Sequence, residues 1–394
     1  MAQEKYLSIG KSVSGFSFAN LGLFTGFADG VYNAVYSLVI LEIFRSSAIV
    51  GIYVALYSAF CMFVSLFANE LFRRFSKVKV FYYATILLIA CYMMMSFSVL
   101  PRTFVVLDWT SGISSTLIAI LIPLFMSDFS RNIGMARLNS RYYLWVNIGA
   151  LFAPTIAVFF AGHFGNRSAF FASALIYMAC LFFFRFLHVS QPDKVVTPIN
   201  PRRTMRSLVK NAIAFFRVRG MTRAYFINFS HYTLRAMRLL YVPIVVIEHG
   251  FSKDTLGLVL TLGIIPYLVL SEWMGRLVRK YGIRLWLVLG FGSFAAISVA
   301  ACVLSGYSLL ACFVLWQFSG AFIEPVHDLM FFDNTKKSQQ TRFYGVFRTS
   351  VKLPNVIAPI IAAACITVFG TTTAVWGITA TVGLLAVALT LCRR

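Results

Sequence analysis

Residues 153–165 read APTIAVFFAGHFG, and residues 358–370 read APIIAAACITVFG. The two stretches lie 205 residues apart and are identical at six of thirteen positions, including the terminal glycines Gly165 and Gly370. Both stretches are apolar enough to belong to helices buried in protein or lipid. Two matching stretches separated by about half the length of the chain indicate an internal repeat.

Other parts of the chain repeat at almost the same distance. NELFRRFSKVKV at 69–80 corresponds to GRLVRKYGIRLW at 275–286, an offset of 206 residues. Two polar residues of the first half recur 205 residues later, Asp128 as Asp333 and Arg137 as Arg342. Separated anchors at one offset predict two halves of the same architecture.

The composition is that of a membrane protein. The 394 residues are 59% hydrophobic and only 12% charged, where a soluble domain carries about 25% charged residues. The N-terminus, MAQEKYLSIGK, is too polar for a signal peptide and lacks a small-residue cleavage site, so the first apolar run should remain as a membrane helix. The seven cysteines form no CxxC pair and are expected to be small buried hydrophobes.

Runs of about 20 mainly apolar residues predict twelve membrane spans. They lie near 15–41, 47–71, 80–99, 103–127, 140–163, 168–187, 221–247, 254–275, 284–303, 307–332, 346–368 and 371–391.

The basic residues predict the orientation. The formal net charge is +22, and most of the 35 Lys and Arg residues fall in loops on one side of the spans. Four lie on the other side, namely Arg45, Arg102, Arg167 and Lys253. The positive-inside rule predicts that both termini lie in the cytoplasm. The expected location is the cytoplasmic (inner) membrane. The basic excess therefore indicates topology and attraction to anionic lipid rather than nucleic-acid binding.

The predicted domain organisation is a six-helix bundle over 1–187, a cytoplasmic basic linker over 188–220 and a second bundle over 221–394. From Met205 onward, an apolar stripe of the linker recurs at helical spacing with Arg and Lys between its members, which are Met205, Leu208, Val209, Ala212, Ile213 and Phe216. This pattern fits a short amphipathic helix on the inner leaflet, and it equally fits a solvated basic linker.

The basic segments after the second and eighth spans resemble the major facilitator superfamily signature G-x-x-x-D-[RK]-x-G-[RK]-[RK]. The first copy runs through Asn69, Arg73, Arg74, Phe75, Ser76 and Lys77, and the second through Gly275, Arg279, Lys280, Tyr281 and Gly282. The family's Asp is Arg in both copies, and its first Gly is Asn69 in the first copy. The resemblance covers nearly the whole chain. It implies an all-α integral membrane protein with twelve transmembrane helices in two pseudo-symmetric six-helix bundles.

A second family motif, G-x-x-x-G-P-x-x-G-G in the fifth span, is matched only loosely by Gly149, Ala153, Pro154 and Ala157. Because the eleventh span has a similar stretch, close packing of small residues is the favoured interpretation.

Ionisable residues within the spans are candidates for a substrate or proton pathway, because a charge in the bilayer centre costs about 2.5–3.5 kcal/mol. The resemblance implies that spans 1, 4, 7 and 10 line the cavity. They carry Asp29, Asp108, His231, Arg235, Arg238, Glu324, His327 and Asp328.

Helical spacing groups these residues. Glu324, His327 and Asp328 share one helical face, and the 221–247 span presents His231, Arg235 and Arg238 on one face. The two sets could pair across the cavity, or serve only as a structural ion pair. Asp29 has no basic neighbour on its own span, and Asp108 could instead lie in the outer headgroup region. The aromatics Tyr32, Tyr36, Tyr232, Tyr241 and Trp316 either line the cavity or pack against neighbouring helices.

Charged residues at the cytoplasmic ends of the spans are candidates for a gate. The residues are Arg73, Arg74, Asp128, Arg137, Arg279, Lys280, Asp333 and Arg342. Asp128 and Asp333 are each expected to approach the basic cluster of their own half as closing latches, or to form solvated surface pairs.

These features predict a secondary active transporter that moves a small-molecule solute by alternating access, possibly coupled to protons, and acts as a monomer. The alternative is a receptor or assembly factor that keeps the fold without transport. No phosphate loop, HExxH, GxSxG or paired metal-ligand spacing occurs, so neither an enzyme nor a metal or other cofactor is expected. The charge of the solute stays open, since Arg235 and Arg238 permit an anionic group and Asp29 a cationic one.

Overall fold

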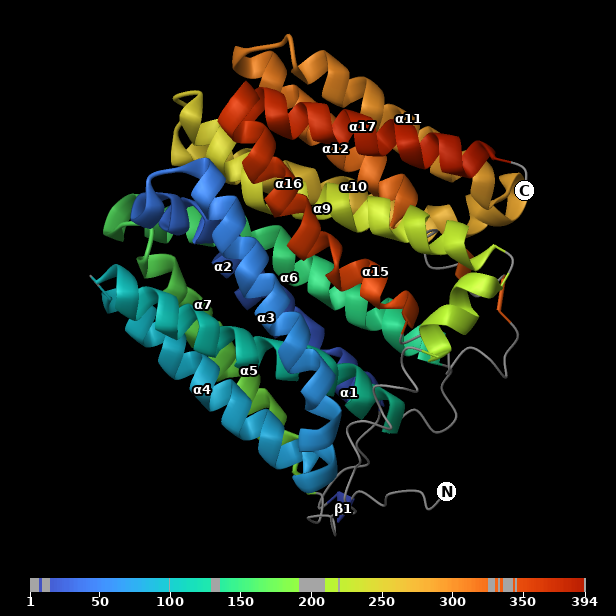
Figure 1. Cartoon of the computed structure of the whole chain (residues 1–394). Coiled ribbons are helices and arrows are strands. Elements are labelled where there is room, and N and C mark those ends of the chain that lie inside the picture. Colours follow the sequence, from blue (N-terminus) through green and yellow to red (C-terminus); the bar gives the residue numbers. More distant parts are fainter. Residues whose placement is uncertain are drawn as a thin grey trace. The chain divides into compact units, whose positions relative to one another are not determined.

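The structure is a computed structural model of the chain, shown in Figure 1. It describes residues 7–8, 15–98, 100–128, 135–190, 210–218, 220–324, 330–331, 334–335, 343 and 346–392. Within these ranges, side chains are not described at 7–8, 66–67, 69–70, 73–74, 127–128, 135–137, 139–140, 190, 271–276 and 279.

The chain divides into two compact units. Unit 1 comprises Met1–Val39 and Phe60–Pro198, and unit 2 comprises Ile40–Ala59 and Ile199–Arg394. The change of unit near residue 198 falls within the predicted linker. The segment 40–59, which the repeat assigns to the first half, packs with unit 2.

The first half of the chain is built from one short helix followed by six long helices in the described residues. They are α1 (Gly15–Ala19), α2 (Leu21–Phe44), α3 (Ser47–Arg74), α4 (Lys77–Phe97), α5 (Pro101–Asp128), α6 (Met135–Phe164) and α7 (Ser168–Phe186). Two-residue strands, β1 (Leu7–Ser8) and β2 (Val189–Ser190), pair antiparallel near the ends of this half. This small ladder leaves the all-α class unchanged.

The second half repeats the same series. Its helices are α9 (Met221–Glu248), α10 (Lys253–Tyr281), α11 (Ile283–Ala301), α12 (Gly306–Ile323), α15 (Thr349–Lys352), α16 (Pro354–Phe369) and α17 (Thr371–Leu391). The expected span 307–332 is α12 up to Ile323, and residues 325–329 lie outside the described part. The expected span 346–368 is divided between α15 and α16.

Helix neighbours repeat as well. In unit 1, α4 packs against α5 and α7; in unit 2, α11 packs against α12 and α17 (Figure 1). Likewise α1 packs against α6, and α9 against α16. The internal repeat of the sequence is therefore a repeat of helix packing inside each unit.

Eleven helices in the described part of the chain are long and apolar enough to cross a membrane. The remaining predicted span, 221–247, is α9, which has 28 residues and is long enough to cross, but its Arg and His side chains make it less apolar. Hydropathy thus gives its weakest signal for the helix that carries His231, Arg235 and Arg238.

One repeated glycine ends a helix in each half. Gly165 follows α6 with φ of 88°, and Gly370 follows α16 with φ of 78°. Only glycine adopts this left-handed backbone without strain, so it terminates a helix cleanly. The repeated stretches 153–165 and 358–370 therefore each end a helix in the same way, at a glycine with positive φ.

The loosely matched motif of the fifth span is a close-packing surface. A Cβ added to Gly149 of α6 would lie 2.7 Å from the backbone N of Phe27, and one added to Gly26 of α2 would lie 2.6 Å from Cα of Val146. The backbones of α2 and α6 approach so closely that only glycine fits at these positions.

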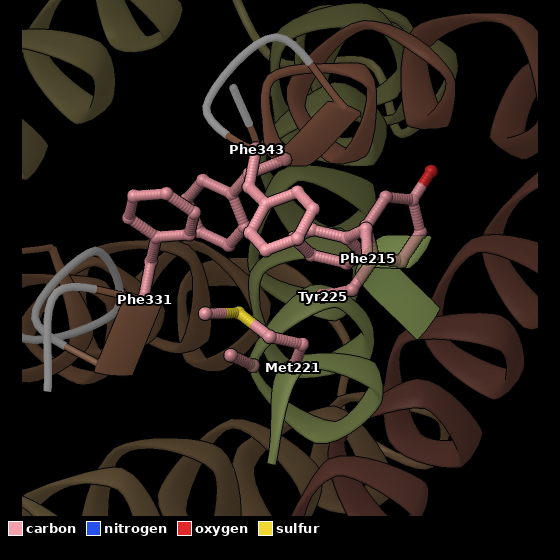
Figure 2. Close-up of a cluster of buried hydrophobic side chains, with 7 residues drawn as sticks. Phe215, Met221, Tyr225, Phe331 and Phe343 are labelled. Atoms are coloured by element: carbon pink, nitrogen blue, oxygen red, sulfur yellow. The ribbon is translucent and has the colours of Figure 1, made fainter. Parts of the chain in front are cut away.

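The linker contains a helix that packs onto unit 2. Residues 210–217 are helical, and Phe215 is fully buried in a cluster with Met221, Tyr225, Phe331 and Phe343 (Figure 2). The linker segment 210–217 therefore packs against unit 2 and is not simply solvated. Ile213 and Phe216 remain exposed, at 52% and 43%.

Candidate functional site

Unit 2 contains a small, partly open pocket. Helices α9, α10, α11 and α12 supply its walls. The lining residues are His231, Leu234, Arg235, Arg238, Tyr267, Phe294, Trp316, Gln317 and Glu324.

Glu324 joins two helices at this pocket. Its carboxylate at the end of α12 lies 2.9 Å from Nε2 of His231 and 3.5 Å from Nη1 of Arg235, both on α9. The His231 side chain is 3% exposed, whereas those of Glu324 and Arg235 are 35% and 44% exposed. The imidazole is therefore enclosed by protein, while the carboxylate and the guanidinium remain partly exposed.

Arg238 lies one turn further along α9 and contacts neutral groups. Its Nη1 donates to Oε1 of Gln317 and to the hydroxyl of Tyr267, the latter at 3.2 Å. The Tyr267 hydroxyl also donates to Gln317 Oε1 at 3.5 Å. These hydrogen bonds link α9, α10 and α12 around the guanidinium.

Two glycines allow this network to form. A Cβ on Gly263 would lie 2.8 Å from Cγ of Gln317, and a Cβ on Gly320 would collide with the Tyr267 hydroxyl. Helices α10 and α12 therefore come close because both positions lack a side chain. The rings of Trp316 and Phe294 pack edge to face, with their centres 5.2 Å apart, and provide an apolar wall of the pocket.

Unit 1 holds the other two carboxylates in a tyrosine cluster. Asp29 of α2 is half-buried, and its Oδ1 accepts a hydrogen bond from the Tyr177 hydroxyl at 2.6 Å. Asp108 of α5 is fully buried and accepts hydrogen bonds from Tyr32 at 2.7 Å and Tyr36 at 3.0 Å. Asp108 is thus enclosed within unit 1, and its depth in the membrane stays a prediction.

Tyrosine rings connect these two carboxylates. The Tyr92 ring lies 5.1 Å from that of Tyr32 and 6.0 Å from that of Tyr177. Among the other aromatics considered from the sequence, Tyr241 is buried beside Gly51, and Tyr232 packs against His231 at 5.3 Å.

The remaining expected site residues are only partly covered. His327, Asp328, Asp333 and Arg342 lie outside the described residues, and the side chains of Arg73, Arg74, Asp128, Arg137 and Arg279 are not described. Lys280 is exposed, with Nζ 5.1 Å from the centre of the Tyr281 ring. The latch pairs therefore stay predictions.

Comparison with known proteins decides the family. A sequence model described as Major Facilitator Superfamily matches residues 18–234 and 224–394. The chain belongs to the Major Facilitator Superfamily. A search of curated proteins finds no match.

Two solved structures share the fold of this chain. A POT family transporter in complex with a thioalcohol-conjugated peptide is 12% identical, with TM-score 0.74 over 95% of this chain and 94% of that one. A mutant of the nucleoside transporter NupG is 11% identical, with TM-score 0.71 over 96% and 98%. Membership supports a multi-pass membrane protein that moves a small-molecule solute, and it points away from an enzyme.

The sequence did not indicate the neutral residues that hydrogen-bond to the charged candidates. Tyr267 and Gln317 hold Arg238, and Tyr177 holds Asp29. Tyr267 and Tyr177 lie on α10 and α7, outside the spans expected to line a cavity. Gln317 could have been singled out, because it is a polar residue in an apolar run, one turn before Gly320 and two before Glu324.

Proposed function

We propose that this protein is a secondary active transporter that works by alternating access and couples solute movement to protons. The observation that supports the proposal is the carboxylate of Glu324, which contacts His231 and Arg235 across two helices of one pocket. An ionised side chain within a membrane span is energetically costly unless it is paired or faces a water-filled cavity. The partners of Glu324 lie on another helix, so a movement of that helix can make or break the ion pair.

The geometry suggests how coupling would work. Arg235 is always protonated, whereas Glu324 and His231 can gain or lose a proton. If α9 and α12 separate, the carboxylate loses its cation and can take a proton in its place. If they close again, the guanidinium displaces that proton. His231, enclosed beside the carboxylate, is positioned to pass the proton on.

Transport in proteoliposomes tests this proposal. Glu324→Gln keeps the shape of the side chain and removes its charge, so we expect loss of pH-driven accumulation while solute exchange continues. Glu42→Gln changes an exposed carboxylate on α2 and serves as the matched control. The readout is uptake from a panel of radiolabelled solutes with and without an imposed pH gradient.

The opposite outcome would move the coupling site. If Glu324→Gln and Asp328→Asn both keep wild-type rates and pH dependence, the cluster is a structural ion pair. Coupling would then be sought at Asp29 and its partner Tyr177. A protein that moves no solute in any condition would instead fit the receptor or assembly-factor alternative.

We further propose a monomer in the cytoplasmic membrane with both termini inside the cell. The basic loops support this orientation and a contact with anionic lipid. The bundles 1–187 and 221–394 would rock about the linker, and Asp128 and Asp333 would hold the cytoplasmic side closed.

A further inference from the structure

Three helix ends of unit 2 meet at one place. Helix α17 packs against both α9 and α11 (Figure 1). Arg223 in the first turn of α9 and Arg284 in the first turn of α11 both reach the last turn of α17. The carbonyl oxygen of Thr390 accepts from Nη2 of Arg223 and, at 3.0 Å, from Nε of Arg284. Two guanidinium groups therefore lie side by side at this end of the unit.

These two residues, the arginine pair, have no carboxylate beside them. In the described part of the chain, their hydrogen bonds go only to the backbone carbonyls of Thr390 and Leu391, and neither arginine forms an ion pair. The two positive charges repel each other. The end of α17 offers about half a negative charge, which does not balance them. Because arginine stays protonated at every physiological pH, the pair is suited to receive an anion whatever the pH.

Both guanidinium groups keep a donor for that anion. Arg223 uses Nη2 and Arg284 uses Nε and Nη2 on α17, so Nη1 of each has no hydrogen-bond partner among the described residues. Arg284 is exposed and Arg223 is partly buried. The carbonyls hold both groups in place before a ligand arrives, which lowers the entropy lost on binding. A phosphate has enough acceptor oxygens to bind two guanidinium groups at once.

Apolar surface adjoins the pair. Leu285 follows Arg284 directly and Leu289 lies one turn further along α11, and they are 44% and 47% exposed. Leu391 at the end of α17 is 52% exposed. The basic segments of the sequence predict that these helix ends face the cytoplasm, where the membrane leaflet carries anionic lipids. A phosphate at the pair would therefore have exposed leucines beside it for the acyl chains of the same molecule.

We propose that the arginine pair binds the phosphate of an anionic phospholipid in the cytoplasmic leaflet. The site is independent of the proposed transport function, because it uses none of the residues of the pocket. It belongs to unit 2 alone. At the 205-residue offset, the counterparts of Arg223 and Arg284 are Phe18 and Lys79, so unit 1 has no second pair.

Lipid binding to the purified full-length protein in a neutral detergent tests the assignment. The probes are dioleoyl phosphatidylglycerol, phosphatidylcholine with the same acyl chains, and inorganic phosphate. Native mass spectrometry during titration gives the Kd of the first bound lipid, and the rise in melting temperature is the second readout. We expect phosphatidylglycerol to bind about tenfold more tightly than phosphatidylcholine, since only its net charge is matched by the pair. Inorganic phosphate at the same concentration should not displace it.

Variants locate the site. Arg284→Gln should weaken phosphatidylglycerol binding by roughly tenfold to a hundredfold, the usual size of a lost charge-assisted hydrogen bond. Arg284→Lys should weaken it less, because an ammonium keeps the charge and loses the planar fork. Lys79→Gln is the matched control, since it removes an exposed cation at the repeat counterpart on α4. It should leave the first bound lipid unchanged.

Arg223→Gln should act like Arg284→Gln, and if it does not fold, the exposed Arg284 and the wild-type protein decide. Equal weakening in Arg284→Gln and Lys79→Gln would assign lipid binding to the basic surface as a whole and overturn the site. Equal binding of the two lipids to the wild-type protein would also overturn it. Displacement of the lipid by inorganic phosphate would show a free-anion site instead.

Discussion

At the scale of the residue, Gly149 shows how one missing side chain sets a helix contact. Its position on α6 faces the backbone of α2, where an added Cβ would lie 2.7 Å from the N of Phe27. A second glycine of the same helix, Gly162, has nothing within 4 Å of its added Cβ. The two positions are therefore a matched pair for one substitution.

We expect Gly149→Ala to destabilise the protein by about 1–3 kcal/mol. The new methyl group would meet the backbone of α2, which cannot move aside by a side-chain rotation. Gly162→Ala should leave stability unchanged or raise it by about 0.5–1 kcal/mol, since alanine favours helix. Thermal unfolding of both purified variants in detergent measures the difference. Equal melting temperatures would contradict close packing at Gly149.

At the scale of the element, the linker helix is held by one side chain. Phe215 has no exposed surface, and its ring meets those of Phe343 at 5.9 Å and Tyr225 at 6.1 Å (Figure 2). Its neighbour Phe216 is 43% exposed. The helix is thus docked through the residue that the predicted apolar stripe did not include, and the stripe residues Ile213 and Phe216 stay free to meet lipid.

Phe215→Ala should undock this helix, because truncating a buried phenylalanine costs about 3–5 kcal/mol of packing. The expected result is faster trypsin cleavage after Lys210 and Arg217, with the rest of the protein intact. Phe216→Ala is the control and should change the cleavage rate much less. If both variants are cut at the wild-type rate, Phe215 does not anchor the linker.

At the scale of the whole molecule, the fold is repeated, but the acidic residues within the spans are not. At the 205-residue offset, the counterparts of Asp29 and Asp108 are Leu234 and Phe313, and that of Glu324 is Ala119. Helix ends and helix neighbours therefore follow the repeat, while each unit carries its own polar chemistry.

The repeat also predicts topology. Arg73 and Arg279 should occupy equivalent positions on the cytoplasmic face, because both follow the second span of their half. Arg73→Cys and Arg279→Cys, in a background with the exposed Cys302 and Cys392 changed to Ser, should react with an impermeant thiol reagent only from the cytoplasmic side. Labelling of either position from the outside alone would refute the orientation.

Particular residues show how far the site was predictable. Glu324 and Arg235 stand out in any apolar run, and the structure brings them together. Tyr267 and Gln317 do not stand out in this way, because tyrosine and glutamine are tolerated on many helix faces and their role depends on which helices are neighbours. For Asp108 the sequence named no partner, and only the structure shows its hydrogen bonds with Tyr32 and Tyr36.

By itself, the sequence determined the class, the repeat and the helices, because hydropathy, helix-ending glycines and basic loops act locally along the chain. Only the tertiary structure decided which charges have charged partners and which have neutral ones. Glu324 meets a histidine and an arginine, whereas Arg238 meets an amide and a phenol. The physical reason is that a hydrogen bond depends on distances of about 3 Å between helices, and such distances follow from packing at positions such as Gly263 and Gly320, far along the chain from α9.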